Sequence, residues 1–369
     1  MATRPLPEQD KRDWLRLIRS THLGPITFHH ILRYYGSAAE AIARLPEIAA
    51  RGGGKRKIEL AAEKTVAAEL KALKACNARL LAWGEPGYPT GLMQLEDAPP
   101  LLAAKGDVAS VSALPGIAMV GARNASAIGQ RFTRDIAAAL TQHGFAVLSG
   151  LARGIDKAAH EGALGAKGKT AAFIGTGIDV AFPPENARLQ DEIAERGAVL
   201  AEMPAGTPPL AQNFPRRNRL ISGASMGVLV VEAALKSGSL ITARMAAEQG
   251  REVMAVPGSP LDPRCRGSNG LIRDGAALIE TVDDILAILA PQQAQRRAET
   301  PTPKPTPIAD DDLSRAHAEI ERLLSPSPVL VDDLVRLSGM ASSLVQMVLT
   351  EQELAGRVLR HPGGKVSAA

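Results

Sequence analysis

The chain of 369 residues contains only two cysteines, Cys76 and Cys265, which lie far apart and outside any C-x-x-C motif. Such low cysteine usage argues against a disulfide scaffold or a cysteine-rich metal site, and it fits a reducing compartment. The N-terminus has no apolar signal region, and no apolar run approaches the length of a membrane span. We therefore expect a cytoplasmic protein that does not associate with membranes.

Several nucleotide-binding and catalytic motifs are also missing. The chain has no Walker lysine motif, no G-x-S-x-G elbow and no acidic metal cluster near its glycine-rich turns. A dinucleotide site needs G-x-G-x-x-G followed by an acid at the end of the next strand. Here the turn reads G-A-R-N-A-S, with Arg123 in place of the second glycine, and the next expected strand ends at Ser149-Gly150. We expect no NAD, no other cofactor and no metal.

The remaining composition is ordinary for a folded protein of two or three domains, with 45% hydrophobic and 22% charged residues. The formal net charge of +4 permits a nucleic-acid partner without requiring one.

Short apolar segments alternate with helical segments between residues 80 and 290. This alternation predicts an α/β fold with a doubly wound, mostly parallel sheet, whose ligands bind beyond the carboxyl ends of the strands. The expected strands are Leu80–Trp83, Ile117–Val120, Ala146–Leu148, Thr170–Ile174, Ala198–Ala201, Gly227–Val231 and Glu252–Val256.

The expected strand ends are rich in glycine, hydroxyl side chains and cations, with few acids. After residues 117–120 comes a tight turn and then a helix from about Gly129, an arrangement that presents backbone N–H groups to an anion. A loop over residues 213–219 places three arginines beside Phe214, which has a ring on which a base can stack. Together these loops predict a phosphate-rich ligand longer than one nucleotide. The expected contacts are Gly121, Arg123, Ser126, Ser149, Gly150, Arg153, Gly154, Gly175, Gly177, Phe214, Arg216, Arg217, Asn218, Arg219, Lys236, Ser237, Gly238 and Ser239.

The two flanks differ from this middle region. Residues 1–79 have a helical pattern, and residues 291–309, rich in Pro, Thr and Gln, indicate a partly extended linker. Within residues 310–369, three expected helices and a hairpin form a winged-helix domain. The third helix, Ser342–Leu354, is the reading helix in a DNA binder, but it carries two acids and no base, so DNA reading and protein contact both remain open.

Two groups of residues offer catalytic interpretations. Asp156 and His160 lie four residues apart on an expected helix, but a third metal ligand is missing, so a helix cap and a core histidine are the better interpretation. Glu232, beside Lys236, is a candidate general base for a phosphoribohydrolase-like enzyme. Such enzymes carry P-G-G-x-G-T before the helix, where this chain has Lys236-Ser-Gly-Ser-Leu-Ile-Thr242. That enzyme remains the alternative to a binding protein without catalytic residues.

Many blocks of residues 80–290 resemble the DNA-processing protein A family, also called Smf. They include Val120-Gly-Ala-Arg123, Ser149-Gly-Leu-Ala-Arg-Gly-Ile-Asp156, Gly175-Thr-Gly-Ile-Asp179, Phe214-Pro-Arg-Arg-Asn-Arg219 and Lys236-Ser-Gly-Ser-Leu-Ile-Thr242. The flanks resemble the family's sterile-alpha-motif-like and winged-helix additions.

The resemblance implies an extended Rossmann-like domain over 80–290, flanked by a helical domain (1–79) and, after the linker, a winged-helix domain (310–369). It implies a non-enzymatic homodimer that binds single-stranded DNA, protects incoming strands in natural transformation, relieves single-strand-binding protein and loads the RecA recombinase. Arg123→Ala or Arg219→Ala is then expected to weaken binding of all sequences without unfolding the protein. The chain departs from the family at Ala224, where leucine is usual, and in its final residues, which lack the wing's aromatic and basic side chains.

Overall fold

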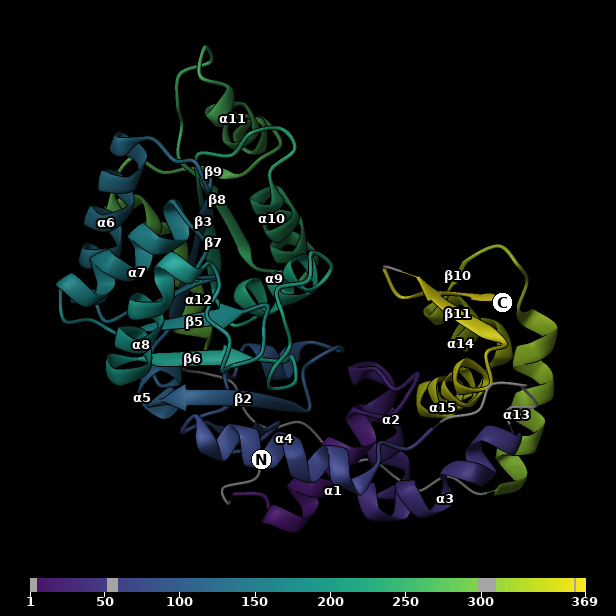
Figure 1. The fold of residues 1–369 in the computed structure, drawn as a ribbon. Coiled ribbons are helices and arrows are strands. Elements are labelled where there is room, and N and C mark those ends of the chain that lie inside the picture. The colour runs from purple at the N-terminus through teal and green to yellow at the C-terminus, as the bar shows by residue number, and fades with distance from the viewer. Residues whose placement is uncertain (1–4, 52–58, 297–309, 362) are drawn as a thin grey trace. The chain divides into compact units, whose positions relative to one another are not determined.

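The computed structural model describes residues 5–51, 59–296, 310–361 and 363–369 (Figure 1). The chain divides into two compact units, which we describe separately. Unit 1 comprises residues 1–5 and 68–300, and unit 2 comprises residues 6–67 and 301–369. No helix in the described ranges is both long enough and apolar enough to span a bilayer.

Unit 1 contains a nine-stranded sheet in the order β1-β2-β6-β5-β4-β3-β7-β8-β9. The strands are β1 (Arg79–Ala82), β2 (Leu101–Gly106), β3 (Gly116–Gly121), β4 (Ala146–Ser149), β5 (Thr170–Ile174), β6 (Ala198–Ala201), β7 (Gly227–Val231), β8 (Glu252–Ala255) and β9 (Ala277–Leu278). Pairing is parallel from β6 to β9, whereas β1 and β2 join antiparallel at the other edge.

The run β5-β4-β3-β7-β8-β9 has the strand order of a Rossmann fold. The chain moves outward from β3 in one direction through β4, β5 and β6, and then returns to place β7 on the other side of β3. The boundary between β3 and β7 is therefore the topological switch point, where open α/β sheets bind their ligands.

Alternating side chains bury both faces of this sheet, as expected for parallel strands. Ile117 and Met119 belong to one core cluster with α6 and α7, and Ala118 and Val120 belong to another with α9 and α10. Figure 1 shows these helix pairs on opposite sides of the sheet. The helices of unit 1 are α4 (Glu63–Ala75, which begins in unit 2), α5 (Val108–Ser112), α6 (Ala127–Gln142), α7 (Ile155–Gly165), α8 (Ala187–Arg196), α9 (Asn213–Gly223), α10 (Gly238–Glu248), α11 (Arg266–Arg273) and α12 (Val282–Arg296).

The expected fold class is confirmed, and each expected strand has a counterpart among β1 and β3–β8. Two strands of the nine-stranded sheet went unrecognised. β2 follows two prolines and is rich in alanine, and it is held by its antiparallel partners β1 and β6; β9 is only two residues long. Helix α12 continues through Pro291 to Arg296, so the first residues of the expected linker are helical. The rest of that linker, 297–309, lies outside the described residues.

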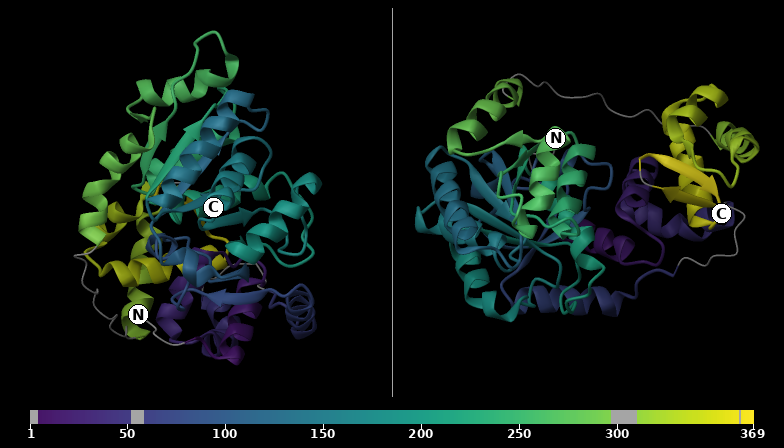
Figure 2. Two further views of the ribbon diagram at one scale, coloured as in Figure 1. Left: turned by 90° about the vertical axis from the view of Figure 1, so that its left-hand side faces the viewer. Right: turned by 90° about the horizontal axis from the view of Figure 1, so that it is seen from above.

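Unit 2 combines the two flanks of the chain. The N-terminal flank supplies α1 (Glu8–Ile18), α2 (Pro25–Tyr35) and α3 (Ala38–Arg51). The C-terminal flank supplies α13 (Asp310–Leu323), β10 (Val329–Leu330), α14 (Val331–Ser338), α15 (Ser342–Leu354), β11 (Val358–His361) and β12 (Lys365–Ala368), which is the expected winged helix with a β10-β12-β11 sheet. In Figure 2, right, the N-terminal helices (purple) lie beside the winged-helix elements (yellow), and α15 contacts α2 and α3.

Candidate nucleic-acid interface

A pocket of unit 1 opens at the switch point. Its volume is about 750 Å³, within the range of ligand sites in proteins. The turn after β3 lines one part of it, from Gly121 to Asn124, and the segment after β7 lines another, through Lys236 to Ser239. Asp156 is the one acid among the described lining residues. The expected position beyond the strand ends thus coincides with a real cavity.

Gly121 is required by the close approach of β3 and β7. A Cβ atom at Gly121 would lie 1.9 Å from the carbonyl oxygen of Val231, a distance that no side chain tolerates. Glycine here therefore lets the turn that carries Arg123 begin directly beside the end of β7.

Residues 213–219 form the first turns of helix α9, which corrects the expectation of a loop. Pro215 is compatible with this helix because it occupies the first turn, where its missing N–H has no intrahelical partner. The helical period divides the expected contacts between two faces. Phe214, Arg217, Asn218 and Ile221, spaced i, i+3, i+4 and i+7, line the pocket, whereas Arg216 and Arg219 do not.

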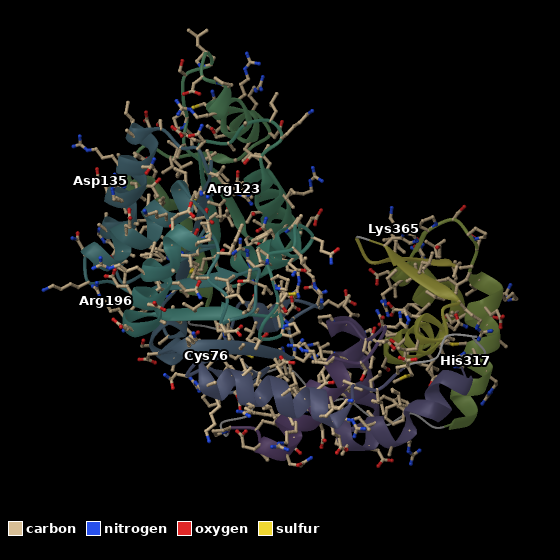
Figure 3. All side chains as sticks on the ribbon, in the orientation of Figure 1. Cys76, Arg123, Asp135, Arg196, His317 and Lys365 are labelled. Carbon is tan, nitrogen blue, oxygen red and sulfur yellow. The ribbon has the colours of Figure 1, made fainter. Side chains whose placement is uncertain are left out.

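Arg123, labelled in Figure 3, is exposed and lines the pocket. It lies over the ring of Phe214, with its Cζ atom 5.9 Å from the ring centroid. The Phe214 ring in turn contacts Phe182, at a centroid separation of 5.4 Å and a tilt of 40°. A smaller space of about 90 Å³ beside them is lined by these three side chains and by Arg217. A cation and two half-buried aromatic rings therefore meet at one wall, a combination suited to a phosphate and an adjoining base.

A second part of the pocket wall is the beginning of helix α10. Ser237 is the N-cap: its Oγ accepts a hydrogen bond from the Ser239 N–H at 3.3 Å and lies 2.5 Å from the Ser239 Oγ. The first turn of α10 contains no acid, so the positive end of the helix dipole has no carboxylate from that turn beside it. Lys236 and Gly238 are exposed next to it. This wall supplies both N–H donors and an ammonium group to an anion.

Arg217 has a different role from the exposed cations because it is 7% exposed and bound to the fold. Its Nη1 donates to the carbonyl oxygens of Gly150, at 2.7 Å, and Phe173. Burial lowers the pKa of Arg217 to about 10, with Asp156 opposing that shift. A Cβ at Gly150 would lie within 2.6 Å of the guanidinium carbon, so glycine is needed where the arginine crosses the chain.

Asp156 completes this buried arrangement. Its Oδ2 accepts hydrogen bonds from the N–H groups of Gly150 (3.2 Å) and Ala152 (3.3 Å). Burial raises its pKa, while the Arg217 charge and the two N–H donors oppose the rise. We call Asp156 and Arg217 the buried clamp, because together they fix the loop of residues 149–154. The clamp holds the carbonyl and amide groups of that loop in place, and Ala152 of the loop lines the pocket.

Arg219 lies on the other face of α9 and is an internal side chain. Its guanidinium donates to Glu202, at 2.5 Å, and to the backbone oxygen of Asp97, at 2.7 Å. The Arg219 and Glu202 side chains are both 9% exposed. Arg216 is exposed and lies 3.7 Å from the same carboxylate. The arginines of the Phe214–Arg219 segment therefore point in three directions: Arg217 inward, Arg219 to Glu202 and Arg216 outward.

Ser126 is engaged by the protein itself. Both its N–H, at 2.8 Å, and its hydroxyl donate to the Glu232 carboxylate, and its Oγ accepts from the Gly129 N–H at 2.9 Å. The beginning of α6, expected to receive a ligand phosphate, thus receives the carboxylate of Glu232. Glu232 lines a separate pocket of about 460 Å³ and is absent from the lining of the 750 Å³ pocket, so the candidate general base does not accompany the phosphate loops.

The remaining expected contacts serve mainly to shape the loops. Arg153 is exposed and paired with Glu185, and Gly154 has a φ of 70°, in the region that favours glycine. Ser149 donates to the Met119 carbonyl at 2.6 Å and is fully buried. Gly175 passes against the Phe214 ring, and Gly177 donates its N–H to the Thr207 carbonyl. These residues lie at the carboxyl end of the sheet but outside the lining of the large pocket.

His160 is a core residue, as expected. It is 0% exposed, its Nδ1 lies 2.7 Å from the Thr170 hydroxyl, and burial lowers its pKa to about 3. Because Thr170 donates to the Val147 carbonyl, the Nδ1–H of a neutral His160 is the donor to Thr170. Asp156 does not cap the helix in the expected way, since it bonds the preceding loop. Among the described residues, no cluster of three or more metal-ligating side chains occurs.

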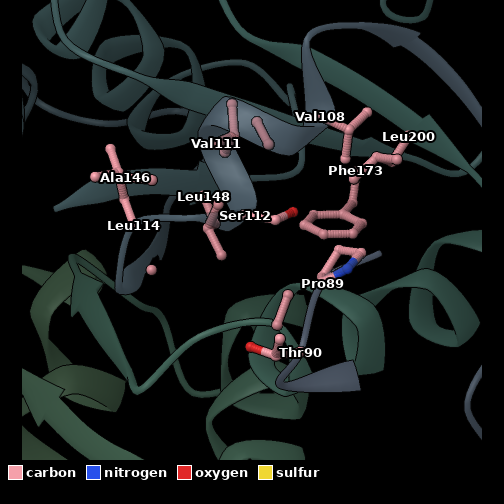
Figure 4. A pocket seen from close by; sticks show the side chains of 13 residues that line it. Pro89, Thr90, Val108, Val111, Ser112, Leu114, Ala146, Leu148, Phe173 and Leu200 are labelled. Atoms are coloured by element: carbon pink, nitrogen blue, oxygen red, sulfur yellow. The ribbon is translucent and has the colours of Figure 1, made fainter. Parts of the chain in front are cut away.

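A further small pocket lies under α5 (Figure 4). Phe173 and Pro89 face each other there beside Val108 and Val111, and the volume is only about 30 Å³. This apolar space is a packing defect large enough for little more than a water molecule.

Two site features were not foreseen from the sequence. Phe182 belongs to the aromatic wall, and its signal was only its being one of six phenylalanines, placed in a loop between glycines and prolines. The role of Asp156 as a loop-holding residue was also missed, because its partners are backbone groups that no side-chain pattern reveals.

Three family models match the chain: DNA recombination-mediator protein A over residues 79–290, the DprA-like N-terminal HHH domain over 8–72, and the DprA winged helix domain over 301–364. Protein Smf of Escherichia coli is 37% identical over 318 residues, covering 82% of this chain and 81% of that protein.

Two solved structures of DNA processing protein A are similar. The protein from Streptococcus pneumoniae gives a TM-score of 0.64 at 32% identity, covering 77% of this chain and 98% of that one. The protein from Helicobacter pylori, described for its unique single-stranded DNA binding mode, gives 0.53 at 27% identity, covering 58% and 96%. With a model matching more than half of its length and a 37% identical relative matched over most of both chains, this chain belongs to the DNA-processing protein A (Smf) family.

Proposed function

We propose that this protein binds single-stranded DNA, without sequence preference, in the 750 Å³ pocket at the switch point between β3 and β7. The observation that carries the proposal is that two groups line the same pocket: Arg123 with the Phe214 and Phe182 rings, and Lys236 with the beginning of α10. Phosphates suit the cations and N–H donors, and bases suit the rings. A single strand fits this use because its bases are free to stack.

The same geometry supports binding without catalysis. The one acid lining the described pocket, Asp156, accepts two backbone N–H groups and lies in the buried clamp. Glu232 is bound to Ser126 and lines another pocket. Neither carboxylate is therefore placed as a general base for a ligand held by Arg123 and Lys236.

Fluorescence anisotropy with labelled oligo-dT tests this site. We expect Arg123→Ala and Lys236→Ala each to raise Kd about tenfold, the equivalent of one charge-assisted contact. Each is also expected to reduce the slope of log K against log salt by about 0.7, the value for one lost phosphate contact on a single strand. Arg131→Ala is the matched control, because the Arg131 side chain is 83% exposed on α6 and outside the pocket lining. Unchanged affinity and slope in both pocket variants would place the DNA elsewhere.

We propose further that the protein acts in the cytoplasm as a homodimeric recombination mediator in natural transformation, protecting incoming strands and loading RecA onto DNA covered by single-strand-binding protein. Membership of the family supports this role. The test is the lag of RecA ATPase activity on DNA precoated with single-strand-binding protein: wild type is expected to shorten the lag and Arg123→Ala to do so much less. Light scattering after size exclusion tests the dimer.

A further inference from the structure

We propose that α15 is a protein-docking helix whose partner is helix α2 of the same chain, and that it serves this contact in place of reading DNA. The third helix is the element that winged-helix DNA readers insert into the major groove, with its outward face free to approach base edges. In unit 2 that helix contacts α2 and α3 in addition to its own domain.

The burial of polar residues on α15 shows that the second half of the helix is covered on several sides. Thr350, Glu351 and Gln352 follow one another in sequence, so they point to different sides of the helix, yet their exposures are 0%, 0% and 2%. Glu351 bonds His317 of α13 at 2.5 Å, within the winged-helix domain. Burial of three consecutive polar side chains requires partners on more than one side, and the N-terminal helices supply the second side.

Among the described contacts, two hydrogen bonds join α15 to α2. The Nδ1 of His30 lies 2.8 Å from the Thr350 hydroxyl, in a fully buried contact. Thr350 in turn donates to the Gln346 carbonyl, so His30 is the donor in its bond to Thr350. At the other end of the contact, Thr27 donates to the Glu353 carboxylate at 3.3 Å.

Apolar packing supports the same pairing. Tyr34 of α2 packs against the core cluster of the winged-helix domain, whose buried members include Val345 and Val348 of α15. The N-terminal helices therefore contribute a side chain to the periphery of the winged-helix core. The contact between α2 and α15 thus combines hydrogen bonds with apolar packing, as specific interfaces do.

The charges of α15 suit docking and oppose DNA reading. The helix contains no Lys or Arg, and it carries Glu351 and Glu353. Arg360 of the wing donates to Glu353 at 3.0 Å. Arg357 pairs with Glu321 at 3.2 Å. A reading helix uses basic and amide side chains to reach bases and phosphates, whereas here the nearby arginines neutralise acids of their own domain.

Thr27 offers a sharp test because it is the third residue of α2. A carboxylate there is favourable for the helix itself, since it lies at the positive end of the dipole, but it faces Glu353 across the contact. Thr27→Lys has the opposite properties: it is less favourable for the helix and complementary to Glu353. Thr27→Gln controls for size. The helix dipole therefore favours Thr27→Glu over Thr27→Lys, whereas docking against Glu353 favours Thr27→Lys over Thr27→Glu.

Hydrogen exchange on the full chain is the measurement. We expect Thr27→Glu to speed amide exchange in α15 by about tenfold relative to Thr27→Gln, because two carboxylates then share one guanidinium, and Thr27→Lys to stay close to the glutamine variant. Reciprocally, His30→Ala is expected to speed exchange in α15, and Thr350→Val in α2. Arg33→Ala and Ser343→Ala, at exposed positions of the two helices, are the matched controls and should change neither.

Duplex DNA binding by the same variants tests whether α15 is a DNA-reading helix that the docking contact covers. We expect Thr27→Glu to bind a duplex no more tightly than wild type does. The proposal is overturned if exchange rises only in α2 while α15 stays as in wild type, because the two domains would then be independent. It is also overturned if the undocked variant gains duplex affinity, because α15 would then be a covered reading helix.

Discussion

Replacing Arg219 by alanine is predicted to lower the stability of the protein, whereas replacing Arg123 by alanine is predicted to weaken DNA binding. Arg219 is paired with Glu202 in a contact where both side chains are 9% exposed, and it also donates to the Asp97 carbonyl. Removing one partner of a buried ion pair costs up to about 3–5 kcal/mol, and here Arg216, 3.7 Å from the same carboxylate, lowers that cost. A domain is typically stable by only about 5–15 kcal/mol, so Arg219→Ala should remove a large share of the free energy of unfolding.

The assay combines urea unfolding with oligo-dT anisotropy. For Arg219→Ala we expect a lower urea midpoint and, in the absence of urea, a Kd close to that of wild type, because Arg219 lies outside the pocket lining. For Arg123→Ala we expect the reverse: a raised Kd with a free energy of unfolding within about 0.5 kcal/mol of wild type, as for other exposed positions. Replacing Glu202 by Gln in the Arg219 variant should restore part of the stability by removing the buried charge.

The reasoning is refuted if Arg219→Ala weakens DNA binding while its unfolding curve coincides with that of wild type. That result would be the one expected from the sequence, in which both arginines were counted as phosphate contacts. It would mean that Arg219 leaves Glu202 to reach the DNA.

Three further predictions follow from the site. Phe214→Ala should weaken binding of oligo-dT and oligo-dA alike by about 1–3 kcal/mol, the loss of one stacked base, with an unchanged salt slope, measured by anisotropy. Asp156→Asn should lower the urea midpoint and raise Kd without reducing the salt slope, since the buried clamp positions the loop and makes no phosphate contact; a smaller slope would contradict this. His160 has a pKa of about 3 in the folded protein, against an ordinary value of 6.5, so the unfolded chain takes up a proton first as the pH falls. Stability should therefore fall as the pH drops from about 6.5 toward 3, and this residue should have no effect above that window. This residue contributes at most about 1.4 kcal/mol per pH unit to the slope of the free energy of unfolding against pH. His160→Asn should make that slope shallower, and the buried His30, with a pKa also near 3, keeps part of it.

The arrangement of the sheet was largely readable from the sequence. Short apolar runs followed by Gly-rich turns marked β3–β8, because parallel strands buried on both faces must be apolar throughout. The strands β2 and β9 were not readable. Their residues depend on pairing with neighbours distant in sequence, such as Ala104 with Leu200, and local composition does not encode that pairing.

The site was predictable in place but not in detail. The strand-end rule located the pocket, and Arg123, Phe214 and Lys236 line it as expected. Reading 213–219 as a loop concealed the helical period that separates Arg217 from Arg219. The carboxylate that occupies the start of α6 was also concealed, because Glu232 and Ser126 lie 106 positions apart and meet only when β7 packs beside β3.

The most direct test of the central claim is anisotropy of wild-type protein with labelled oligo-dT and with a matched duplex, each at low and moderate salt. We predict binding of the single strand that is clearly tighter than binding of the duplex and that weakens as salt rises, because phosphates meet Arg123 and Lys236 while free bases meet the aromatic wall. Equal affinity for the two forms, or no binding of the single strand at either salt, would contradict the account.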